Sequence, residues 1–224
     1  IILALPSDVA DFRMRIFNAD GSEARMCGNG SRCVGKLVSD RGLTSADEIT
    51  LDTLAGVKTL QLHRGTDGKV DTVTVAMGRA VVERPLELTT SAGPVTVIPV
   101  DMGNPHAVVF IDNDPDDYDV HRIGRELELD PVWPDRANIE FARVLSPDRV
   151  KVRVWERGSG ETMACGTGAC ATAAAALASG RCGRLSTIGL PGGDLIIDVD
   201  PATMEVTMTG PAVTSFTGEV GIDF

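Results

Sequence analysis

An internal repeat constrains this chain more than any other feature. The segment FRMRIFNADGSEARMCGNGSRCVGKLV, residues 12–38, returns 138 residues later as VKVRVWERGSGETMACGTGACATAAAA, residues 150–176. Each copy begins with apolar residues at alternate positions, which predicts a strand. A turn, the pattern Glu-x-x-x-Cys-Gly-x-Gly and a run of helix-forming residues follow, and this run stops at Gly42 or Gly180. A duplicated strand, turn and helix predicts two lobes related by a pseudo-twofold axis.

The repeat places Cys27 and Cys165 at the predicted starts of two helices. The unpaired N–H groups and the positive dipole end of a helix favour an anion, and they can lower the pKa of a cysteine from roughly 8.5 to about 3.5–7.5. If both helix starts face one cleft between the lobes, one thiolate can take a proton from a chiral carbon while the other thiol returns a proton to the opposite face. This is the geometry of a racemase. The alternative is that each cysteine only fills a tight helix start.

Small and polar residues flank both predicted thiols. Gly28 and Gly166 allow backbone N–H groups to approach an anion closely, and Asn29 and Thr167 lie in the same loops. We therefore expect these four residues to bind the substrate carboxylate, mainly through their backbone. A phosphate-binding loop is the rival interpretation. Neither copy ends in Gly-Lys-Ser/Thr, however, and GNGSRC lacks the third glycine of a dinucleotide fingerprint.

Asn18 and Glu156 occupy equivalent positions nine residues before each cysteine, and Arg157 follows Glu156. One position is neutral and the other is charged, which suits a substrate with different groups at its two ends. Arg157 offers a two-point contact to a carboxylate. The alternative is a Glu–Arg pair on the surface with no role in binding.

The segments NADGSEARMCGNGSRC, GNPHAVVF, ERGSGETMACGTGA and GPAVTSFTGEV resemble the diaminopimelate epimerase family, and the resemblance covers essentially the whole chain. It implies an isomerase that converts ll- to meso-diaminopimelate, a lysine and peptidoglycan precursor, with no pyridoxal phosphate, no other cofactor and no metal. It also implies that Glu156 meets the reacting amino group and Arg157 the distal carboxylate. Other two-cysteine racemases of the same fold, acting on proline, hydroxyproline or histidine, stay open as alternatives. So does an inactive, truncated ligand-binding form.

The resemblance implies further substrate-binding residues. Asn104 and His106 belong to GNPHAVVF, and Asn138 belongs to RANIEF. Around Asn138, Ala137 and Glu140 stand where the resembled family leads us to expect threonine and asparagine. This departure concerns the shape of the distal pocket.

The predicted fold class is α+β, with two pseudo-symmetric lobes that are each a mostly antiparallel sheet or barrel around a central helix. The active site is expected in the cleft between them. We expect residues 1–88 to form the first lobe and residues 89–212 the second, with the link at residues 85–94. The resemblance implies that residues 213–224, which are β-rich in composition, return to the first lobe.

A strand unit at residues 97–112 precedes the second copy of the repeat, and the first copy has no counterpart of it. In the resembled family an N-terminal block fills this place. N-terminal strands of the first lobe are therefore expected to be missing, and an apolar face of that lobe is expected to be exposed.

The charge and the cysteines limit the partners. A net charge of −11 argues against nucleic acid or an anionic membrane surface, so the expected partner is a small-molecule substrate, and a homodimer stays open. A cytoplasmic location is the default. Five cysteines without a dense framework predict reduced thiols, and their spacing does not fit zinc. Cys33, Cys170 and Cys182 are predicted to be small buried apolar residues.

Overall fold

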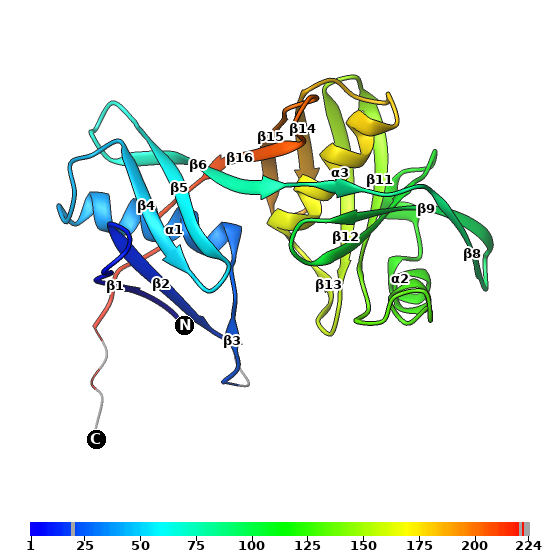
Figure 1. Cartoon of the computed structure of the whole chain (residues 1–224), viewed down its shortest axis with the longest axis horizontal. Helices are drawn as coiled ribbons and strands as arrows, with labels where there is room; N and C mark the ends of the chain where they lie inside the picture. Colours follow the sequence, from blue (N-terminus) through cyan, green and yellow to red (C-terminus); the bar gives the residue numbers. More distant parts are fainter. Residues whose placement is uncertain (19–20, 220, 222–224) are drawn as a thin grey trace.

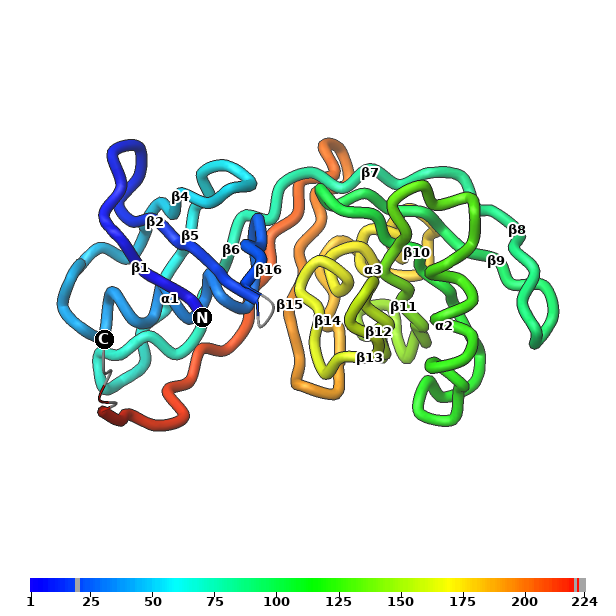
Figure 2. The backbone as a smooth tube through the Cα atoms, turned by 90° about the horizontal axis from the view of Figure 1, so that it is seen from below, coloured from blue at the N-terminus to red at the C-terminus, as the bar shows by residue number. Residues whose placement is uncertain are grey.

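The computed structural model describes residues 1–18, 21–219 and 221, and these form two lobes side by side (Figures 1 and 2). The first lobe contains β1 (Ile2–Leu5), β2 (Phe12–Phe17), β3 (Glu23–Ala24), α1 (Gly28–Asp40), β4 (Glu48–Thr53), β5 (Gly56–Arg64) and β6 (Val70–Arg79). The second contains β7 (Val81–Val82), β8 (Leu86–Thr90), β9 (Gly93–Asp101), β10 (Pro105–Phe110), the 3-10 helix η1 (Pro115–Asp117), α2 (Val120–Glu128), β11 (Asn138–Ser146), β12 (Arg149–Glu156), β13 (Gly160–Thr162), α3 (Gly166–Ala178), β14 (Leu185–Leu190), β15 (Gly193–Val199) and β16 (Glu205–Pro211).

The two copies of the repeat have the same strand pairing. In the first, β2 pairs antiparallel with β3 and parallel with β4. In the second, β12 pairs in the same way with β13 and β14. The hydrogen-bonded order is β1-β2-β4-β5-β6-β16-β15-β14-β12-β11-β10-β9-β7, so the antiparallel pair β6–β16 joins the lobes. This arrangement confirms the predicted α+β fold of two pseudo-symmetric, mostly antiparallel lobes, each around one helix.

The helices of the repeat end where the glycines predicted. Gly42 and Gly180 follow α1 and α3 with φ angles of 70° and 68°, a conformation that glycine adopts without steric cost. The residue after each glycine donates its backbone N–H to the end of the helix. Leu43 donates to Val38 O at 2.9 Å, and Arg181 donates to Ala176 O at 2.8 Å. These bonds satisfy carbonyl groups that the helix itself leaves unpaired.

The sheet of the second lobe encloses α3 more completely than the sheet of the first lobe encloses α1. Ala171 and Ala175 of α3 are fully buried, whereas their equivalents in α1, Cys33 and Leu37, are exposed. The prediction that Cys33 is buried is therefore wrong, and those for Cys170 and Cys182 are confirmed. The difference follows from the strands: β10 and β9 continue the sheet beyond β11, whereas its counterpart β1 is an edge strand within the described residues.

An apolar surface lies on this open side of the first lobe, as predicted. Ile2 of β1 is 42% exposed and Leu37 of α1 is 46% exposed. Residues 213–218 run along the first lobe (Figure 2). Of these, Val213, Thr214 and residues 216–218 line a groove together with Ile2 and Leu37. The described part of this C-terminal segment lies with the first lobe and forms no strand, in contrast to the β structure expected from its composition. Residues 220 and 222–224 lie outside the described residues.

The predicted link between the lobes is wrong. Residues 86–101 form the β8–β9 hairpin, in which Leu86 and Leu88 pair with Val97 and Val95. β7 also pairs with β9, so Val81 and Val82 belong to the same paired strands. Bounding prolines suggested a linker, but the alternating apolar side chains complete a sheet instead.

None of the helices in the described chain is long and apolar enough to span a membrane.

The core of the first lobe provides a test of stability. Leu60 of β5 is fully buried beneath α1, and Leu54 in the turn before β5 is 45% exposed. We expect Leu60→Ala to lower the free energy of unfolding by about 3 kcal/mol, because it removes buried methyl groups and leaves a cavity. The matched control Leu54→Ala should change it by less than about 0.5 kcal/mol. Urea unfolding followed by circular dichroism measures both. Equal effects would show that α1 does not pack on β5 as described.

Candidate active site

Cys27 and Cys165 are the N-cap residues of α1 and α3. Each has an extended backbone, and each sulfur accepts a hydrogen bond from the N–H group three residues later. Gly30 donates to Cys27 Sγ at 3.3 Å, and Gly168 donates to Cys165 Sγ at 3.4 Å. An N-cap side chain normally satisfies an unpaired N–H group of the first turn in this way. The prediction that a cysteine stands at each helix start is confirmed.

Met208 of β16 lies between the two helix starts. Its Cε is 2.6 Å from the position that a Cβ on Gly28 would take, and its Sδ is 3.2 Å from the same position on Gly166. Asn29 Oδ1 is 3.8 Å from that position on Gly166, so the first turns of α1 and α3 approach each other around Met208. A side chain at either glycine would displace the methionine. The β6–β16 pair thus brings together two loops that are far apart in the sequence.

The environment of Cys165 differs from the expectation for a cysteine at a helix start. The side chain is buried, and burial raises the pKa of the Cys165 thiol to about 12. The nearby charges of Glu156 and Glu140 add to this rise, while hydrogen bonds from Thr167 and Gly168 oppose it. Desolvation and two carboxylates therefore outweigh the helix terminus. The expectation of a lowered pKa is wrong for Cys165, which is a thiol, and hence a proton donor, at neutral pH.

Polar side chains of the first helical turns lie near the thiols. Asn29 Oδ1 is buried and has no hydrogen-bond partner among the residues that the structure describes. Thr167 Oγ1 is 3.5 Å from Cys165 Sγ. Because a buried polar atom without a partner costs free energy, Asn29 favours a polar ligand between the helix starts.

Arg32 of α1 is a buried cation beside Met208. Its Nε donates to Pro211 O at 3.2 Å, and Nη1 lies 3.8 Å from Met208 Sδ. Burial lowers the pKa of Arg32, and the charges of nearby cysteines, Cys27 among them, would oppose that effect. A positive side chain thus lies on the side of the first thiol, and negative side chains lie on the side of the second.

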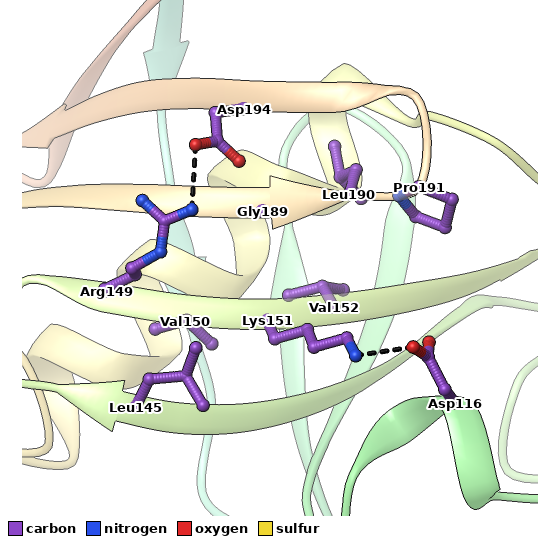
Figure 3. Close-up of a pocket in the computed structure, with 10 residues that line it drawn as sticks. All are labelled: Asp116, Leu145, Arg149, Val150, Lys151, Val152, Gly189, Leu190, Pro191 and Asp194. Atoms are coloured by element: carbon purple, nitrogen blue, oxygen red, sulfur yellow. Dashed lines mark hydrogen bonds and ion pairs between the residues drawn. The ribbon is translucent and has the colours of Figure 1, made fainter.

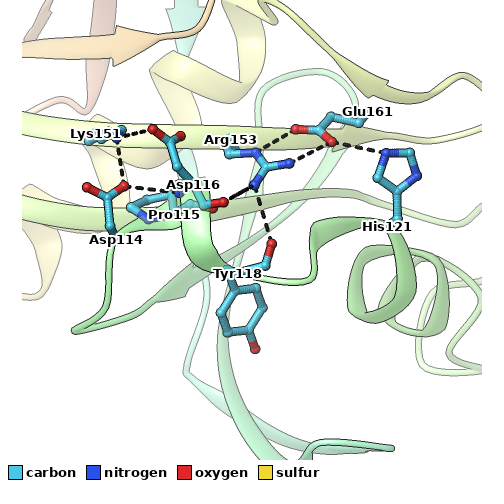
Figure 4. A network of polar contacts seen from close by, with 8 residues as sticks. All are labelled: Asp114, Pro115, Asp116, Tyr118, His121, Lys151, Arg153 and Glu161. Atoms are coloured by element: carbon cyan, nitrogen blue, oxygen red, sulfur yellow. Dashed lines mark hydrogen bonds and ion pairs between the residues drawn. The ribbon is translucent and has the colours of Figure 1, made fainter.

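The strands that lead to the two thiols carry the same ion pair. Arg15 of β2 contacts Glu23 of β3 through two nitrogens, both at 2.8 Å, and Arg153 of β12 contacts Glu161 of β13 at 2.6 and 2.8 Å (Figure 4). His121 of α2 also reaches Glu161, at 3.3 Å. Both pairs occupy equivalent positions of the repeat, so the sequence could have indicated them. They fix each strand to the short strand that precedes a cysteine.

Glu156 is the last residue of β12, and Arg157 lies in the turn that follows. Thr162 Oγ1 donates to Glu156 Oε1, and Arg157 Nη1 donates to Asp135 O at 2.8 Å. Arg157 is exposed, so its side chain is accessible to a ligand. The structure places Glu156 close enough to Cys165 to affect its pKa. The binding roles of both residues stay predictions.

Asn138, at the start of β11, connects two predicted site segments. Its Oδ1 accepts from the backbone N–H of Arg157 at 2.9 Å, and its Nδ2 donates to Pro105 O at 3.3 Å. The side chain is 5% exposed. Asn138 therefore holds the turn after β12 against the turn before β10, and a direct contact with substrate stays a prediction.

Asn18 and Asn104 lie in turns that the sequence had singled out. Asn18 Nδ2 donates to Ser22 Oγ at 3.0 Å in the exposed turn after β2, beside residues 19–20, which lie outside the described residues. Asn104 is half-buried between β9 and β10, and its carbonyl accepts from Met102 N–H at 3.1 Å. Neither contact tests substrate binding, so both roles stay predictions.

His106 of β10 is buried beside Glu140 of β11. His106 Nδ1 and Glu140 Oε1 are 2.7 Å apart, and both side chains are fully buried. Glu140 is one of the two departures from the resembled family around Asn138. It faces α3 and does not lie in an exposed pocket, because its Oε1 is 2.7 Å from the position of a Cβ on Gly168.

Glu128, in the last turn of α2, is a positioning residue that the sequence did not reveal. It accepts from Trp155 Nε1 at 2.7 Å, from Gly158 N–H at 3.0 Å and from Arg136 at 3.4 Å. Burial alone would raise the pKa of its carboxyl, but these hydrogen bonds outweigh burial and lower it. An acidic residue is unfavourable near a helix C-terminus, and this was the available signal. Glu128 holds the turn that carries Arg157.

We expect Glu128→Gln to loosen this turn. Glutamine has a single acceptor oxygen, whereas the carboxylate of Glu128 accepts from three donors at its two oxygens. The KM for a substrate bound by Arg157 should rise by about 10-fold, with a smaller change in kcat, since a hydrogen bond to a charged group contributes about 1.5–3 kcal/mol. Steady-state kinetics measure both constants. An unchanged KM in a folded variant would show that the turn does not need Glu128.

Two grooves on the surface are separate from the thiols. One, of about 330 Å³, lies on the outer face of the second lobe between the ion pairs Arg149–Asp194 and Lys151–Asp116 (Figure 3). The other is the groove along α1 beside residues 213–218. No predicted site residue lines either groove. In the described chain, no group of three or more His, Cys, Asp or Glu side chains is arranged to hold a metal ion.

Comparison with known proteins gives a consistent result. The family model described as diaminopimelate epimerase matches residues 1–83 and 98–215. The chain is 51% identical to the diaminopimelate epimerase of Bacteroides thetaiotaomicron, covering 98% of this chain and 81% of that relative. It is 45% identical to that of Acetivibrio thermocellus, covering 100% of this chain and 84% of that relative.

Solved structures show the same fold at low sequence identity. A hydroxyproline epimerase from Agrobacterium vitis superposes with a TM-score of 0.76 at 21% identity, covering 94% of this chain and 71% of that one. A probable proline racemase from Agrobacterium radiobacter has a TM-score of 0.77 at 18% identity, covering 99% and 76%. At these identities the likeness concerns the fold alone.

Proposed function

This chain belongs to the diaminopimelate epimerase family, and from that premise we propose that it interconverts ll- and meso-diaminopimelate by inverting one α-carbon with two cysteines. The observation that carries the proposal is the pair of cysteine N-caps at equivalent positions of the repeat, whose helix starts meet around Met208. An epimerase needs one group on each face of the carbon, and a pseudo-twofold arrangement supplies them.

In the proposed reaction, Cys27 as thiolate removes the α-proton, and Cys165 as thiol delivers a proton to the opposite face. The C–H bond broken and the C–H bond formed lie on the same carbon, so the reaction has no net change in atoms or electrons. In the reverse direction the two cysteines exchange roles. The high pKa of Cys165 supports its place as the donor of the resting protein. The N–H groups of the first helical turns stabilise the negative charge that develops beside the carboxylate.

Binding roles complete the proposal. Gly28, Gly166, Asn29 and Thr167 surround the substrate carboxylate at the helix starts. Glu156 meets the amino group, and Arg157 binds the distal carboxylate. Asn18, Asn104, His106 and Asn138 complete the substrate site. The support is that Gly28, Asn29, Gly166 and Thr167 lie in the first turns of α1 and α3, and that Asn138 bonds both to Arg157 N–H and to Pro105 O.

The alternatives have less support. The structures of a proline racemase and a hydroxyproline epimerase share the fold at 18–21% identity, whereas diaminopimelate epimerases share about half of all residues. An exposed arginine beside Glu156 suits a substrate with a second charged end. An inactive ligand-binding form would retain the binding residues without need of two thiols. The homodimer, the cytoplasmic location and the lobe boundaries stay predictions.

Exchange of solvent deuterium tests the function. When the protein and ll-diaminopimelate are incubated in D₂O, we expect deuterium at the α-carbon and the meso form as product, both followed by NMR and mass spectrometry. Proline and hydroxyproline should exchange at the background rate. Binding of diaminopimelate without exchange would identify a ligand-binding form, and exchange of proline would identify a different racemase.

A further inference from the structure

Glu140 is a buried carboxylate near the second thiol, and the proposed reaction gives it no role. It lies on β11, opposite Val154 of β12 and on the same face as that residue, toward α3. Its side chain is fully buried. A carboxylate in such a place is costly unless it is paired, so its presence calls for a physical explanation.

His106 is the partner of Glu140. The 2.7 Å contact between His106 Nδ1 and Glu140 Oε1 requires a proton between the two atoms, because neither a bare nitrogen nor a carboxylate oxygen can donate without one. Glu140 Oε2 and His106 Nε2 are also buried, and neither has a hydrogen-bond partner within the described residues. The two side chains form a buried acid–base pair, and at one point this pair meets the turn that carries the second thiol.

That point is the first turn of α3. The position of a Cβ on Gly168 is 2.7 Å from Glu140 Oε1 and 3.3 Å from Cys165 Sγ. The carboxylate oxygen and the sulfur are therefore at most about 6 Å apart, a separation at which a charge affects the ionisation of its neighbour. Only a glycine leaves room for this approach.

The other groups that face Cys165 come from three elements. Glu156 at the end of β12 is negative, and Thr167 and the Gly168 N–H on α3 donate hydrogen bonds. Cys170, one turn further along α3, is buried and neutral, since burial raises its pKa. The cation Arg32 on α1 interacts with Cys27 and Cys170. Glu140 is thus, among the described groups that act on Cys165, the fully buried carboxyl group.

We propose that Glu140 is a positioning residue of the reaction: paired with His106 and packed on the first turn of α3, it keeps Cys165 a thiol in the resting protein and thereby fixes which cysteine gives the first proton. This inference rests on the proposed function. His106 fixes the rotamer of Glu140, and Gly168 permits the carboxylate to lie beside the helix start. Together with burial and Glu156, this contact makes the two cysteines unequal.

The sign of the effect is determined by charge. A negative Glu140 disfavours the Cys165 thiolate, so replacing it with the neutral and isosteric glutamine should lower the pKa of the Cys165 thiol by about one unit. At a fixed pH below that pKa, the fraction of Cys165 thiolate rises about 10-fold. Glutamine can still accept from His106 Nδ1–H, so the packing is retained.

The test uses the two diastereomers of a β-halogenated diaminopimelate. Removal of its α-proton expels the halide and forms a double bond, so the reaction reports on the first base alone. We expect Glu140→Gln to raise, by up to about 10-fold at neutral pH, the elimination rate of the diastereomer that Cys165 deprotonates. The elimination rate of the diastereomer that Cys27 deprotonates should be unchanged. A merely structural role would lower both rates together, and that result would overturn the proposal.

Glu128→Gln is the matched control. Glu128 is also a buried carboxylate of the second lobe, but its partners Trp155 and Gly158 lie near the end of β12 and in the turn after it. The control should change the elimination rates of both diastereomers in the same proportion, so that the ratio of the two rates stays the same. If Glu140→Gln does not fold, the double variant Glu140→Gln, His106→Gln replaces both partners by amides that can bond to each other, and it should give the same faster alkylation of Cys165 in the assay without substrate.

An assay without substrate separates this proposal from the proposed function. Peptide-resolved alkylation by iodoacetamide should modify Cys165 about 10-fold faster in Glu140→Gln than in the unaltered protein at pH 8, and in the unaltered protein Cys165 should react more slowly than Cys27. These rates do not depend on any epimerase activity. An unchanged Cys165 rate in a folded variant, or equal rates for both cysteines in the unaltered protein, would overturn the role of Glu140. Failure of deuterium exchange alone would overturn only the proposed function.

Discussion

Replacing Cys27 or Cys165 by serine lowers the rate of epimerisation by about 10³-fold or more, because each replacement removes one of two groups that act on opposite faces of the same carbon. A serine hydroxyl is a much weaker acid than a thiol, so it supplies neither the base nor an efficient donor. The fold should persist in both variants, since serine is itself a favourable N-cap residue that can accept the hydrogen bonds now made by the sulfurs. Circular dichroism and the melting temperature check this.

Elimination gives a sharper result than epimerisation. With the β-halogenated analogue only the first proton abstraction is needed, so each single variant should still process one diastereomer and be almost inactive towards the other. The two variants should lose opposite diastereomers. If Cys27→Ser and Cys165→Ser both lose the same one, a single base performs the reaction, and the mechanism derived from the repeat is wrong. Cys33→Ser is the control, because Cys33 is exposed on the outer face of α1 and should not affect either rate.

Arg157→Lys raises the KM for diaminopimelate by about 10- to 100-fold, which is the expected cost of losing a charge-assisted two-point contact of about 1.5–3 kcal/mol. Lysine keeps the charge but not the planar fork. Because Arg157 is exposed and its position is held by backbone contacts to Asn138, the variant should fold normally. Steady-state kinetics with both stereoisomers measure the effect.

Arg149→Lys is the control for this prediction. Arg149 lies at the opposite end of β12, is exposed and pairs with Asp194 at 2.8 Å. A surface ion pair of this kind contributes about 0–1 kcal/mol, so KM should not change. An unchanged KM in Arg157→Lys would remove the distal carboxylate contact from the proposal and would weaken the case for diaminopimelate as substrate.

The local structure of the site could be predicted from the sequence because its signals are local. Alternating valines at 150–154 predicted β12, and Gly42 and Gly180 predicted the helix ends. The equal spacing of the repeat placed both cysteines at helix starts. Periodicity, caps and glycine conformations act within a few residues, so they determine local structure wherever the chain packs.

The prediction of a link at residues 85–94 was wrong because prolines and polar residues occur in hairpins as well as in linkers. Leu86 and Leu88 join the sheet through pairing with Val97 and Val95. The prediction that Cys33 is buried was wrong because burial depends on which strands cover a helix, and the helices of the two copies are covered differently. A sequence motif does not state which strands pack against it.

The sequence by itself determined that two cysteines begin two equivalent helices. Only the tertiary structure decided that these cysteines differ in chemistry. Glu140 arrives from β11 and Glu156 from β12, and together with burial they raise the pKa of Cys165 to about 12. Arg32 lies on the side of Cys27. The N-cap is a property of local sequence, whereas the ionisation of a thiol depends on the charges and solvent within several ångströms of it, and only the folded chain brings those groups together.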